Sequence, residues 1–321
     1  ELTRRLTELA IRHNVVVVHT HFSRFDIAAA LAKVACALKW RTFHLVWHMH
    51  SAFGPEASWS RRLKDLMKLR VLGRFCHSVP VSGPLGDDVR ERGFPPDRIH
   101  VIQNGIDLDH ATARRRSRAE VRRQLRVADT ATVLLGFGWT PIRKGVDTML
   151  EALRSLANRG EPAVLVLVGS EELKQYLNKW PDRAWLEAVR VVPPEEMVGD
   201  LFAAADVFLS PSRAEGWCYA VAEAIANGVP AAAARIPAVS WAEQAPGVLF
   251  SPPEDSEALA DNIRRFLALT SEERAQLADM AKEFIRTRHS VELWGRSVWE
   301  LYASLLGWNK SPGGRSSAVL S

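Results

Sequence analysis

Short apolar runs alternate with amphipathic segments along most of the chain. Residues 15–18 (VVVV), 132–138 (TVLLGFG), 163–169 (AVLVLVG) and 206–210 (DVFLS) are nearly uninterrupted apolar runs, a pattern typical of strands buried on both faces. The segments between them place apolar residues at helical spacing. Strands that alternate with helices in this way predict parallel sheets covered by helices, an α/β doubly wound fold.

The first part of the chain is expected to hold three such strands, each followed by a helix. The expected strands are residues 15–21, 43–47 and 77–81, and the expected helices lie within 1–14, 26–38, 60–75 and 87–93. The composition changes at residues 111–126 (ATARRRSRAEVRRQLR), which we interpret as a hinge and the opening helix of a second unit. We therefore expect a first domain at 1–110 and a second, Rossmann-like domain at 111–288. A helix at 289–308 should cross back to the first domain, and 309–321 should be a disordered tail.

Composition places the chain among ordinary globular proteins. Of 321 residues, 47% are hydrophobic and 25% are charged, and no apolar run is long enough to span a bilayer. Three widely spaced cysteines, Cys36, Cys76 and Cys218, favour a reducing cytoplasm over a disulfide framework or a zinc site. The net charge of +5 favours anionic partners such as nucleotides or lipid head groups.

The stretch at residues 209–230 (LSPSRAEGWCYAVAEAIANGVP) has the most specific chemistry. A buried strand ends at Ser210, and a helix is expected to start near Cys218, so Glu215 falls in the connecting loop and Glu223 in the helix. Such loops lie at the carboxyl ends of parallel strands, where ligands bind, and the free N–H groups at the helix start attract anions. Two carboxylates beside an anion site predict a ligand with both phosphates and hydroxyls, such as a nucleotide-sugar.

Four motifs now follow one another along the chain. They are His19-Thr20-His21, Asn104-Gly105-Ile106-Asp107, Arg143-Lys144-Gly145, and Glu215 with Glu223. Together they resemble the retaining glycosyltransferases of the GT-B fold, family 4 (glycosyl transferases group 1), over nearly all of residues 10–306. The family pattern PS-x-x-EG-F-G … E-A-M-A-x-G-x-P stands here as PSRAEGWCYAVAEAIANGVP. The resemblance implies two Rossmann-like domains facing a cleft. It also implies transfer of a sugar from a nucleoside-diphosphate sugar to a glycan, lipid-linked or small-molecule acceptor, with retention of configuration.

The resemblance also implies a role for individual residues. Glu215 would hold the transferred sugar, Glu223 the ribose, and Lys144 the diphosphate. The backbone N–H groups of Gly216 and Trp217 would face the sugar or the phosphates. His21 would lie near the reacting sugar, and His19, His48 and His50 are interpreted as structural. Arg143 is a further candidate for the diphosphate, because Trp139 stands where the family often has an arginine.

No metal or cofactor is expected beyond the donor substrate. Asp107-Leu108-Asp109 matches a metal-binding D-x-D pattern, but it lies within the hinge motif and is interpreted as structural. A further departure from the family is the start of the chain. Before residue 15 there is no opening strand with a glycine-rich loop, so we expect the first domain to be incomplete there.

Three other functions fit parts of the sequence. The first is a protein of the same fold that binds sugar nucleotides without turning them over, and the motifs are compatible with it. A nucleic-acid binder is suggested by the basic run at 114–118, but no helix-turn-helix, RNP or zinc pattern accompanies it. A glycosidase would not need Lys144 and a phosphate-binding helix.

The basic helix at 60–75 has two interpretations. It either packs on its own sheet or docks the protein peripherally on an anionic membrane.

Overall fold

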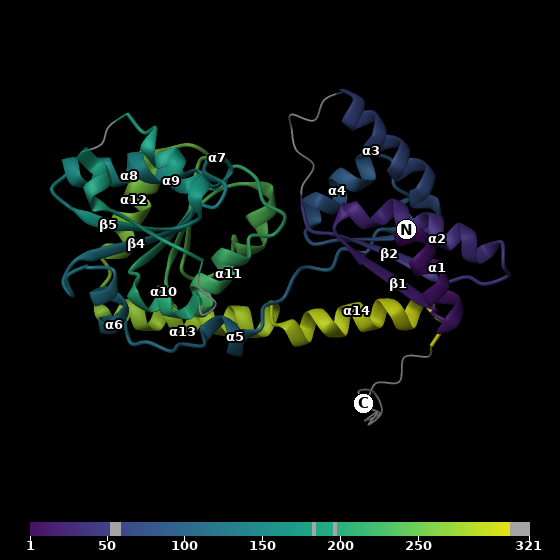
Figure 1. The fold of residues 1–321 in the computed structure, drawn as a ribbon. Helices are drawn as coiled ribbons and strands as arrows, with labels where there is room; N and C mark the ends of the chain where they lie inside the picture. The colour runs from purple at the N-terminus through teal and green to yellow at the C-terminus, as the bar shows by residue number, and fades with distance from the viewer. Residues whose placement is uncertain (52–58, 182–183, 195–197, 309–321) are drawn as a thin grey trace. The chain divides into compact units, whose positions relative to one another are not determined.

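The computed structural model describes residues 1–51, 59–181, 184–194 and 198–308. Within it the chain forms two compact units (Figure 1). Unit 1 comprises residues 1–103 and 292–321, and unit 2 comprises Asn104–Val291. The last helix therefore belongs to the same unit as the first hundred residues. No helix among the described residues is both long enough and apolar enough to span a membrane.

Unit 1 is built on a parallel sheet of three strands, β1 (Val17–His21), β2 (His44–Met49) and β3 (His77–Pro80), in the order β1-β2-β3. Its helices are α1 (Leu2–Arg12), α2 (Asp26–Ala37), α3 (Trp59–Val71), α4 (Gly83–Glu91) and α14 (Val291–Leu305). One face of the sheet packs against α14 through Val46 and Val79 on the strands and Val298 and Leu301 on the helix. Since side chains alternate between faces along a strand, the residues in register with Val46, or two positions along, share this face.

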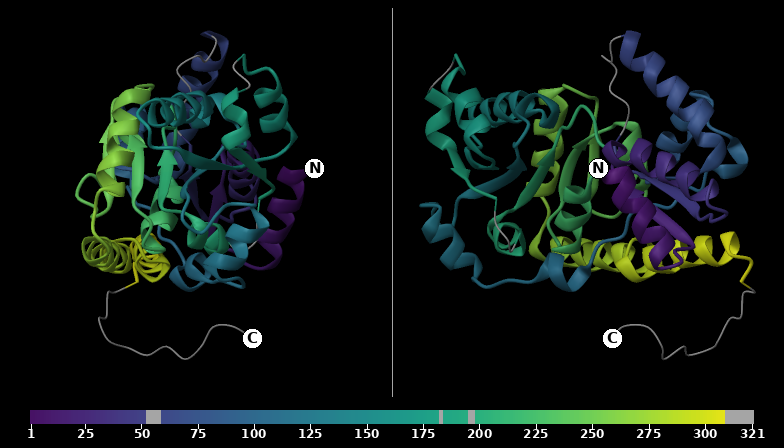
Figure 2. Two further views of the ribbon diagram at one scale, coloured as in Figure 1. Left: turned by 90° about the vertical axis from the view of Figure 1, so that its left-hand side faces the viewer. Right: turned by 45° about the vertical axis from the view of Figure 1, so that its right-hand side comes forward.

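Unit 2 is built on a parallel sheet of six strands in the order β6-β5-β4-β7-β8-β9. Figure 2 shows two further views of the fold. The strands are β4 (Thr132–Phe137), β5 (Ala163–Val168), β6 (Val189–Val192), β7 (Val207–Ser210), β8 (Ala231–Ala234) and β9 (Val248–Ser251). The helices are α5 (Leu108–Thr112), α6 (Arg118–Gln124), α7 (Pro141–Lys144), α8 (Val146–Asn158), α9 (Glu171–Asn178), α10 (Val198–Ala204), α11 (Tyr219–Ala226), α12 (Ser256–Leu267) and α13 (Ser271–Arg288). One face is covered by α8, α9 and α12, whose leucines form the core with β4, β5 and β7.

The order of the strands in unit 2 fixes where a ligand is expected. The chain runs from β4 outward to β5 and β6, and then returns to the other side of β4 to form β7. This reversal is a topological switch point, and the loops after β4 and β7 leave the same edge of the sheet side by side. The segment after β4 includes the short helix α7 with Arg143 and Lys144, and the loop after β7 contains Glu215.

The secondary structure differs from the sequence expectation in a few places. Residues 231–234, four alanines that were not expected to form a strand, are the buried strand β8. Helix α11 begins at Tyr219, one residue later than expected, and α4 begins at Gly83 rather than Asp87. The expected disordered tail at 309–321 lies outside the described residues.

The segment at 104–107 joins the two ends of unit 2. The N–H of Ile106 donates to the carbonyl of His289 (2.8 Å), and the N–H of Val291 donates to the carbonyl of Ile106 (2.9 Å). A Cβ atom on Gly105 would lie 2.2 Å from the carbonyl oxygen of Ser290, so only glycine fits at this position. The Asp107 side chain caps α5 by accepting a hydrogen bond from the N–H of His110, in keeping with a structural role for the D-x-D pattern.

Candidate functional site

Two loops at the switch point of unit 2 are held together by backbone contacts. The N–H of Arg213 in the loop after β7 donates to the carbonyl of Arg143 in the loop after β4 (2.8 Å). Gly145 has a φ of +67°, and a Cβ atom there would lie 2.2 Å from the carbonyl oxygen of Pro211. A glycine after Lys144 is therefore required both by the left-handed conformation and by the close approach of the second loop.

The side chain of Arg213 strengthens the same connection. Its guanidinium forms two hydrogen bonds with the carboxylate of Asp147 (2.9 and 2.6 Å) and one with Glu254 (3.1 Å). A bidentate pair of this kind fixes the orientation of the two side chains and also adds interaction energy. Arg213 therefore spans from the loop after β7 to the first turn of α8, and it positions the loop that carries Glu215.

Lys144 and Glu215 meet at the junction of these loops. The Lys144 Nζ donates to Glu215 Oε1 at 2.6 Å, and the two side chains are only 7% and 11% exposed. Lys144 also lies over the ring of Trp139, 5.2 Å from its centroid. Burial limits the rotation of both side chains and holds them in contact. The site therefore presents one ammonium and one carboxylate at the carboxyl edge of the sheet.

Glu223 lies on α11 and keeps its carboxylate available. No hydrogen bond to this carboxylate comes from the residues that the structure describes. Burial raises its pKa, and the charges of His110 and Lys144 oppose this rise. Glu223 is therefore a half-buried acceptor that can take its partners from a ligand or from water. The nearby His110 was not singled out from the sequence, where it is merely the residue after the D-x-D pattern.

The turn before α11 has an unusual backbone. Cys218 precedes the helix with a φ of +66°, a region that non-glycine residues rarely adopt. Within the described part of the chain, the backbone N–H groups of Gly216 and Trp217 have no hydrogen-bond acceptor. Unpaired N–H groups beside a helix start are suited to bind an anion.

The side chain of Trp217 has a structural task. It is 2% exposed and stacks on Trp241 at a centroid distance of 4.6 Å, and its ring also meets His289. The Trp241 Nε1–H donates to the backbone carbonyl of Trp217 (2.6 Å). Only the backbone of Trp217 can therefore face a ligand. Trp241 supports the loop from a distant position in sequence, and nothing in the local sequence pattern marks it.

Arg143 is placed differently from its neighbour Lys144. Its side chain is exposed, and its Nε donates to Thr140 Oγ1 at 3.3 Å. Among the described residues it forms no ion pair, so its guanidinium is free to turn toward a ligand. The structure thus brings Lys144, Glu215 and Glu223 into one region of unit 2, with Arg143 at its surface.

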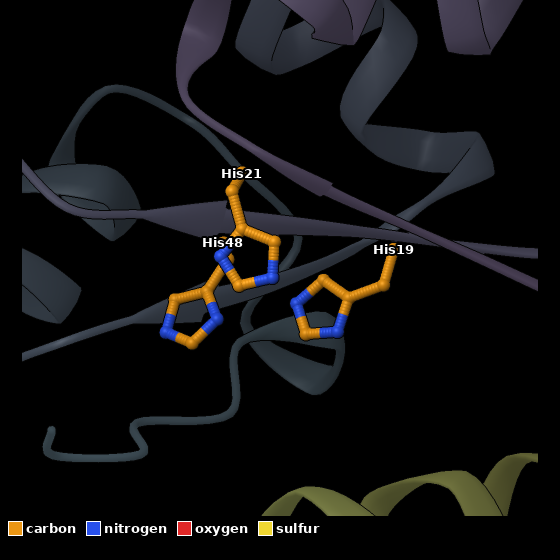
Figure 3. A group of neighbouring side chains, drawn as sticks. All are labelled: His19, His21 and His48. Carbon is orange, nitrogen blue, oxygen red and sulfur yellow. The ribbon is translucent and has the colours of Figure 1, made fainter. Parts of the chain in front are cut away.

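His21 belongs to unit 1 and ends β1. Its Nδ1 lies 2.9 Å from Nε2 of His50, and its ring stacks between those of His19 and His50. Burial lowers the pKa of His21, so the ring is neutral at pH 7. His19, His48 and His50, interpreted from sequence as separate structural residues, form one cluster with His21, part of which is drawn in Figure 3.

Two family models match the chain. "Glycosyl transferases group 1" matches residues 117–284, just over half of the chain, and "Glycosyltransferase Family 4" matches residues 1–110. The first match contains Lys144, Glu215 and Glu223, and the second contains His21.

Curated relatives share about a quarter to a third of the aligned residues. A lipopolysaccharide 1,2-N-acetylglucosaminetransferase of Salmonella typhimurium is 27% identical over 262 residues, which is 77% of this chain and 64% of that protein. A D-inositol 3-phosphate glycosyltransferase of Saccharomonospora viridis is 31% identical over 210 residues, 61% of this chain and 48% of the relative. The chain thus spans between about half and two thirds of the length of these relatives.

Solved structures show the same fold. A glycosyltransferase from Rickettsia africae superimposes with a TM-score of 0.81 at 18% identity, covering 95% of this chain and 80% of that one. Anabaena Alr3699/HepE in complex with UDP gives a TM-score of 0.79 at 20% identity, covering 94% and 82%. The two-unit α/β architecture expected from the sequence is therefore the GT-B fold.

Proposed function

Because the chain belongs to the glycosyl transferases group 1 family, we propose that it moves a sugar from a nucleoside-diphosphate sugar to an acceptor with retention of anomeric configuration. The observation that carries the proposal is the buried pair of Lys144 and Glu215, with Glu223 open on the adjoining helix. A cation, two carboxylates and free N–H groups match the phosphates and hydroxyls of one donor molecule.

The proposed chemistry follows from where charge develops. When the sugar–phosphate bond breaks, the departing diphosphate gains negative charge, and fixed donors placed there lower the barrier. Lys144, the N–H groups of Gly216 and Trp217, and the exposed Arg143 are the groups we assign to this task. Glu215 would hold hydroxyls of the transferred sugar and Glu223 those of the ribose. His21 would act near the reacting sugar from unit 1.

The names of the relatives support a nucleotide-sugar donor. Alr3699/HepE was solved with UDP and with UDP-glucose, and one curated relative, from Mycobacterium tuberculosis, is named a GDP-mannose-dependent mannosyltransferase. A thermal-shift scan of nucleoside-diphosphate sugars would identify the donor, because a ligand that binds the folded state raises Tm.

The decisive experiment follows the donor in the presence of candidate acceptors. Release of nucleoside diphosphate together with a product that keeps the donor's anomeric configuration, assigned by NMR coupling constants, is the expected result. Donor binding without release under any acceptor would instead support a protein that binds sugar nucleotides without turnover. A product of inverted configuration would contradict the assignment of retention.

We also propose peripheral contact with anionic membrane through α3. Leu63, Met67 and Val71 recur at helical spacing and are 42%, 55% and 47% exposed. Lys68 does not contribute, because its Nζ is paired with Asp26 at 2.5 Å. The side chains of Arg61, Arg62 and Lys64 lie outside the described residues. Sedimentation with acidic and neutral vesicles tests the contact, and equal binding to both would contradict it.

A further inference from the structure

Four histidines project from one face of the unit 1 sheet. His19 and His21 are two residues apart on β1, and His21 is in register with His48 on β2, two residues before His50. Side chains two apart, or in register on parallel strands, point to the same face. Four ring pairs in this cluster are stacked, with centroids 4.3 to 5.1 Å apart, and the rings of His21 and His48 are tilted by 33° with centroids 4.9 Å apart.

Several nitrogens in this cluster are buried without a partner. His48 is 2% exposed, and within the described part of the chain neither Nδ1 nor Nε2 of its ring has a hydrogen-bond partner. The same holds for Nε2 of His19. Buried polar atoms are normally satisfied, since leaving one unpaired costs about 1–3 kcal/mol. Three unpaired nitrogens buried in one cluster indicate a missing partner.

Two nitrogens on the proposed ligand rings are held by neighbours. Nδ1 of His19 lies 2.5 Å from the hydroxyl of Tyr302 on α14, and Nδ1 of His21 lies 2.9 Å from Nε2 of His50. When each of these Nδ1 atoms donates its hydrogen, the Nε2 atom on the other side of the ring presents a lone pair. This is how histidine ligands of metal sites are oriented by their outer partners. Tyr302 and His50 are placed for that role.

We propose that His19, His21 and His48 bind one divalent transition-metal ion of the Zn²⁺ type through three imidazole nitrogens. One candidate nitrogen from each ring lies within 4.8 Å of the other two (Figure 3). Bonds of about 2.0–2.1 Å in tetrahedral geometry need nitrogens about 3.3 Å apart, so the rings turn inward on binding. A water molecule completes the coordination, and His50 remains the outer partner of His21.

The environment selects the metal. Imidazole coordinates a metal ion in its neutral form, and of the proposed ligands His48 is buried while His19 and His21 are half-buried. Neutral imidazoles without carboxylates suit Zn²⁺, Cu²⁺ or Ni²⁺ and not Mg²⁺ or Ca²⁺. His21 and His50 are partly exposed, which gives the ion a way in.

Competition with a chromophoric chelator would measure Zn²⁺ binding to the full chain. We expect one ion per chain, with no competition from Mg²⁺. His48→Gln and His21→Gln should each weaken binding by at least about tenfold, and Tyr302→Phe, which removes an outer partner, by roughly tenfold. Co²⁺ should give visible d–d bands that His48→Gln abolishes.

A second histidine pair supplies the matched control. His77 and His100 lie 3.1 Å apart in the same unit, and among the described residues the ring of His77 contacts those of His44 and His100 but none of the proposed ligands. His100→Gln should therefore leave Zn²⁺ affinity unchanged. Circular dichroism checks that each variant folds. If burial makes His48→Gln unstable, the partly exposed His21 and the conservative Tyr302→Phe still decide the matter. Binding that survives both of those variants, or that falls equally in His100→Gln, would overturn the proposal.

Discussion

At the scale of single residues, Lys144 and Glu215 contribute to the stability of the fold and are also the groups proposed to bind the donor. Both are almost fully buried, and their mutual contact at 2.6 Å offsets part of the cost of losing hydration. The same two groups are the ones we assign to the diphosphate and the sugar. Removing either one therefore affects stability and binding at once, and the two effects have to be separated.

Lys144→Ala should weaken nucleoside-diphosphate binding by roughly 1.5–3 kcal/mol, because a charge-assisted hydrogen bond is lost. It should also lower the free energy of unfolding by roughly 3–5 kcal/mol, because Glu215 is left buried and unpaired. Calorimetry and urea unfolding measure the two quantities. The double variant Lys144→Met with Glu215→Gln should recover most of the stability while binding stays weak. Parent-like affinity in the single variant would show that Lys144 does not bind the diphosphate.

Glu223→Gln should have effects of opposite sign on stability and binding. Burial raises the pKa of Glu223, so ionisation costs stability once the pH exceeds the ordinary carboxyl range. The variant should therefore be more stable than the parent at pH 7, and this gain should vanish below about pH 4, where the parent is protonated in both states. Nucleoside-diphosphate binding should weaken, because an amide is a poorer acceptor for a diol.

Tm measured at pH 7 and pH 4, together with calorimetry at pH 7, tests this pair of effects. Glu243→Gln is a suitable control, because Glu243 is an exposed partner of Arg235 on the surface of the same unit. It should change neither quantity by more than a few tenths of a kcal/mol. A Glu223→Gln variant that is no more stable than the parent at pH 7 would contradict the buried charge.

At the scale of elements, the histidine face of β1 and β2 makes unit 1 sensitive to acid. Burial is the largest cause that lowers the pKa of His19 and His50 to about 4 and that of His48 to about 2. An unfolded chain takes up these protons near pH 6.5 and the folded chain does not. Stability is thus fully present above pH 6.5 and is lost as the pH falls toward 4.

Urea unfolding with a chelator present should show a lower midpoint at pH 5.5 than at pH 7.5, a range in which ordinary carboxylates stay ionised. Each histidine kept neutral contributes up to about 1.4 kcal/mol per pH unit. His77, His100, His44 and His289 also have lowered pKa values and act in the same direction. His48→Phe should reduce the change of stability with pH by about the contribution of one histidine. A midpoint that does not change with pH would mean that the histidine face is hydrated.

The element that sequence patterns missed is β8. Alanine has low strand propensity, and residues 231–234 offer neither alternation nor branched side chains. They form a strand because they lie between β7 and β9, where all four residues are at most 1% exposed. Small side chains leave room for α12, which packs on this region. Packing against neighbours decided this element, and no local signal could have revealed it.

At the scale of the whole molecule, the chain leaves unit 1 after residue 103 and returns to it at residue 292. The segments beside these two boundaries pair with each other at Ile106 and Ser290. Gly105 makes this pairing possible, because any side chain would meet the Ser290 carbonyl at 2.2 Å. Both ends of unit 2 are thereby fixed together.

Gly105→Ala should lower the free energy of unfolding by about 1–3 kcal/mol, since backbone has to move to admit the new methyl group. Gly295→Ala is the matched control. Gly295 lies within α14 with nothing within 4 Å of the position of its Cβ, so alanine should stabilise the helix by roughly 0.5–1 kcal/mol. Thermal unfolding of both variants measures the contrast. Equal effects of the two substitutions would show that the pairing at Ile106 is not tight.

The sequence by itself determined the fold class and the candidate residues for binding the nucleotide-sugar donor, because both follow from patterns within short stretches of the chain. Apolar runs of strand length between amphipathic segments require parallel sheets. The order of the motifs around Lys144, Glu215 and Glu223 indicated a glycosyltransferase of group 1, which the family match confirms. Gly145 was recognisable as part of a motif, although its reason, the approach of Pro211, was not visible.

Only the tertiary structure decided which of these residues meet. Lys144 and Glu215 are 71 positions apart and form an ion pair because β4 lies beside β7 in the sheet. His21 and His48 belong to successive strands and are in register. This register brings together, in one cluster, histidines that the sequence analysis interpreted as separate structural residues. Trp217 was placed by its stacking on Trp241, so its side chain belongs to the core. Each of these outcomes depends on strand order and register, which are set by long-range packing that no short stretch of sequence encodes.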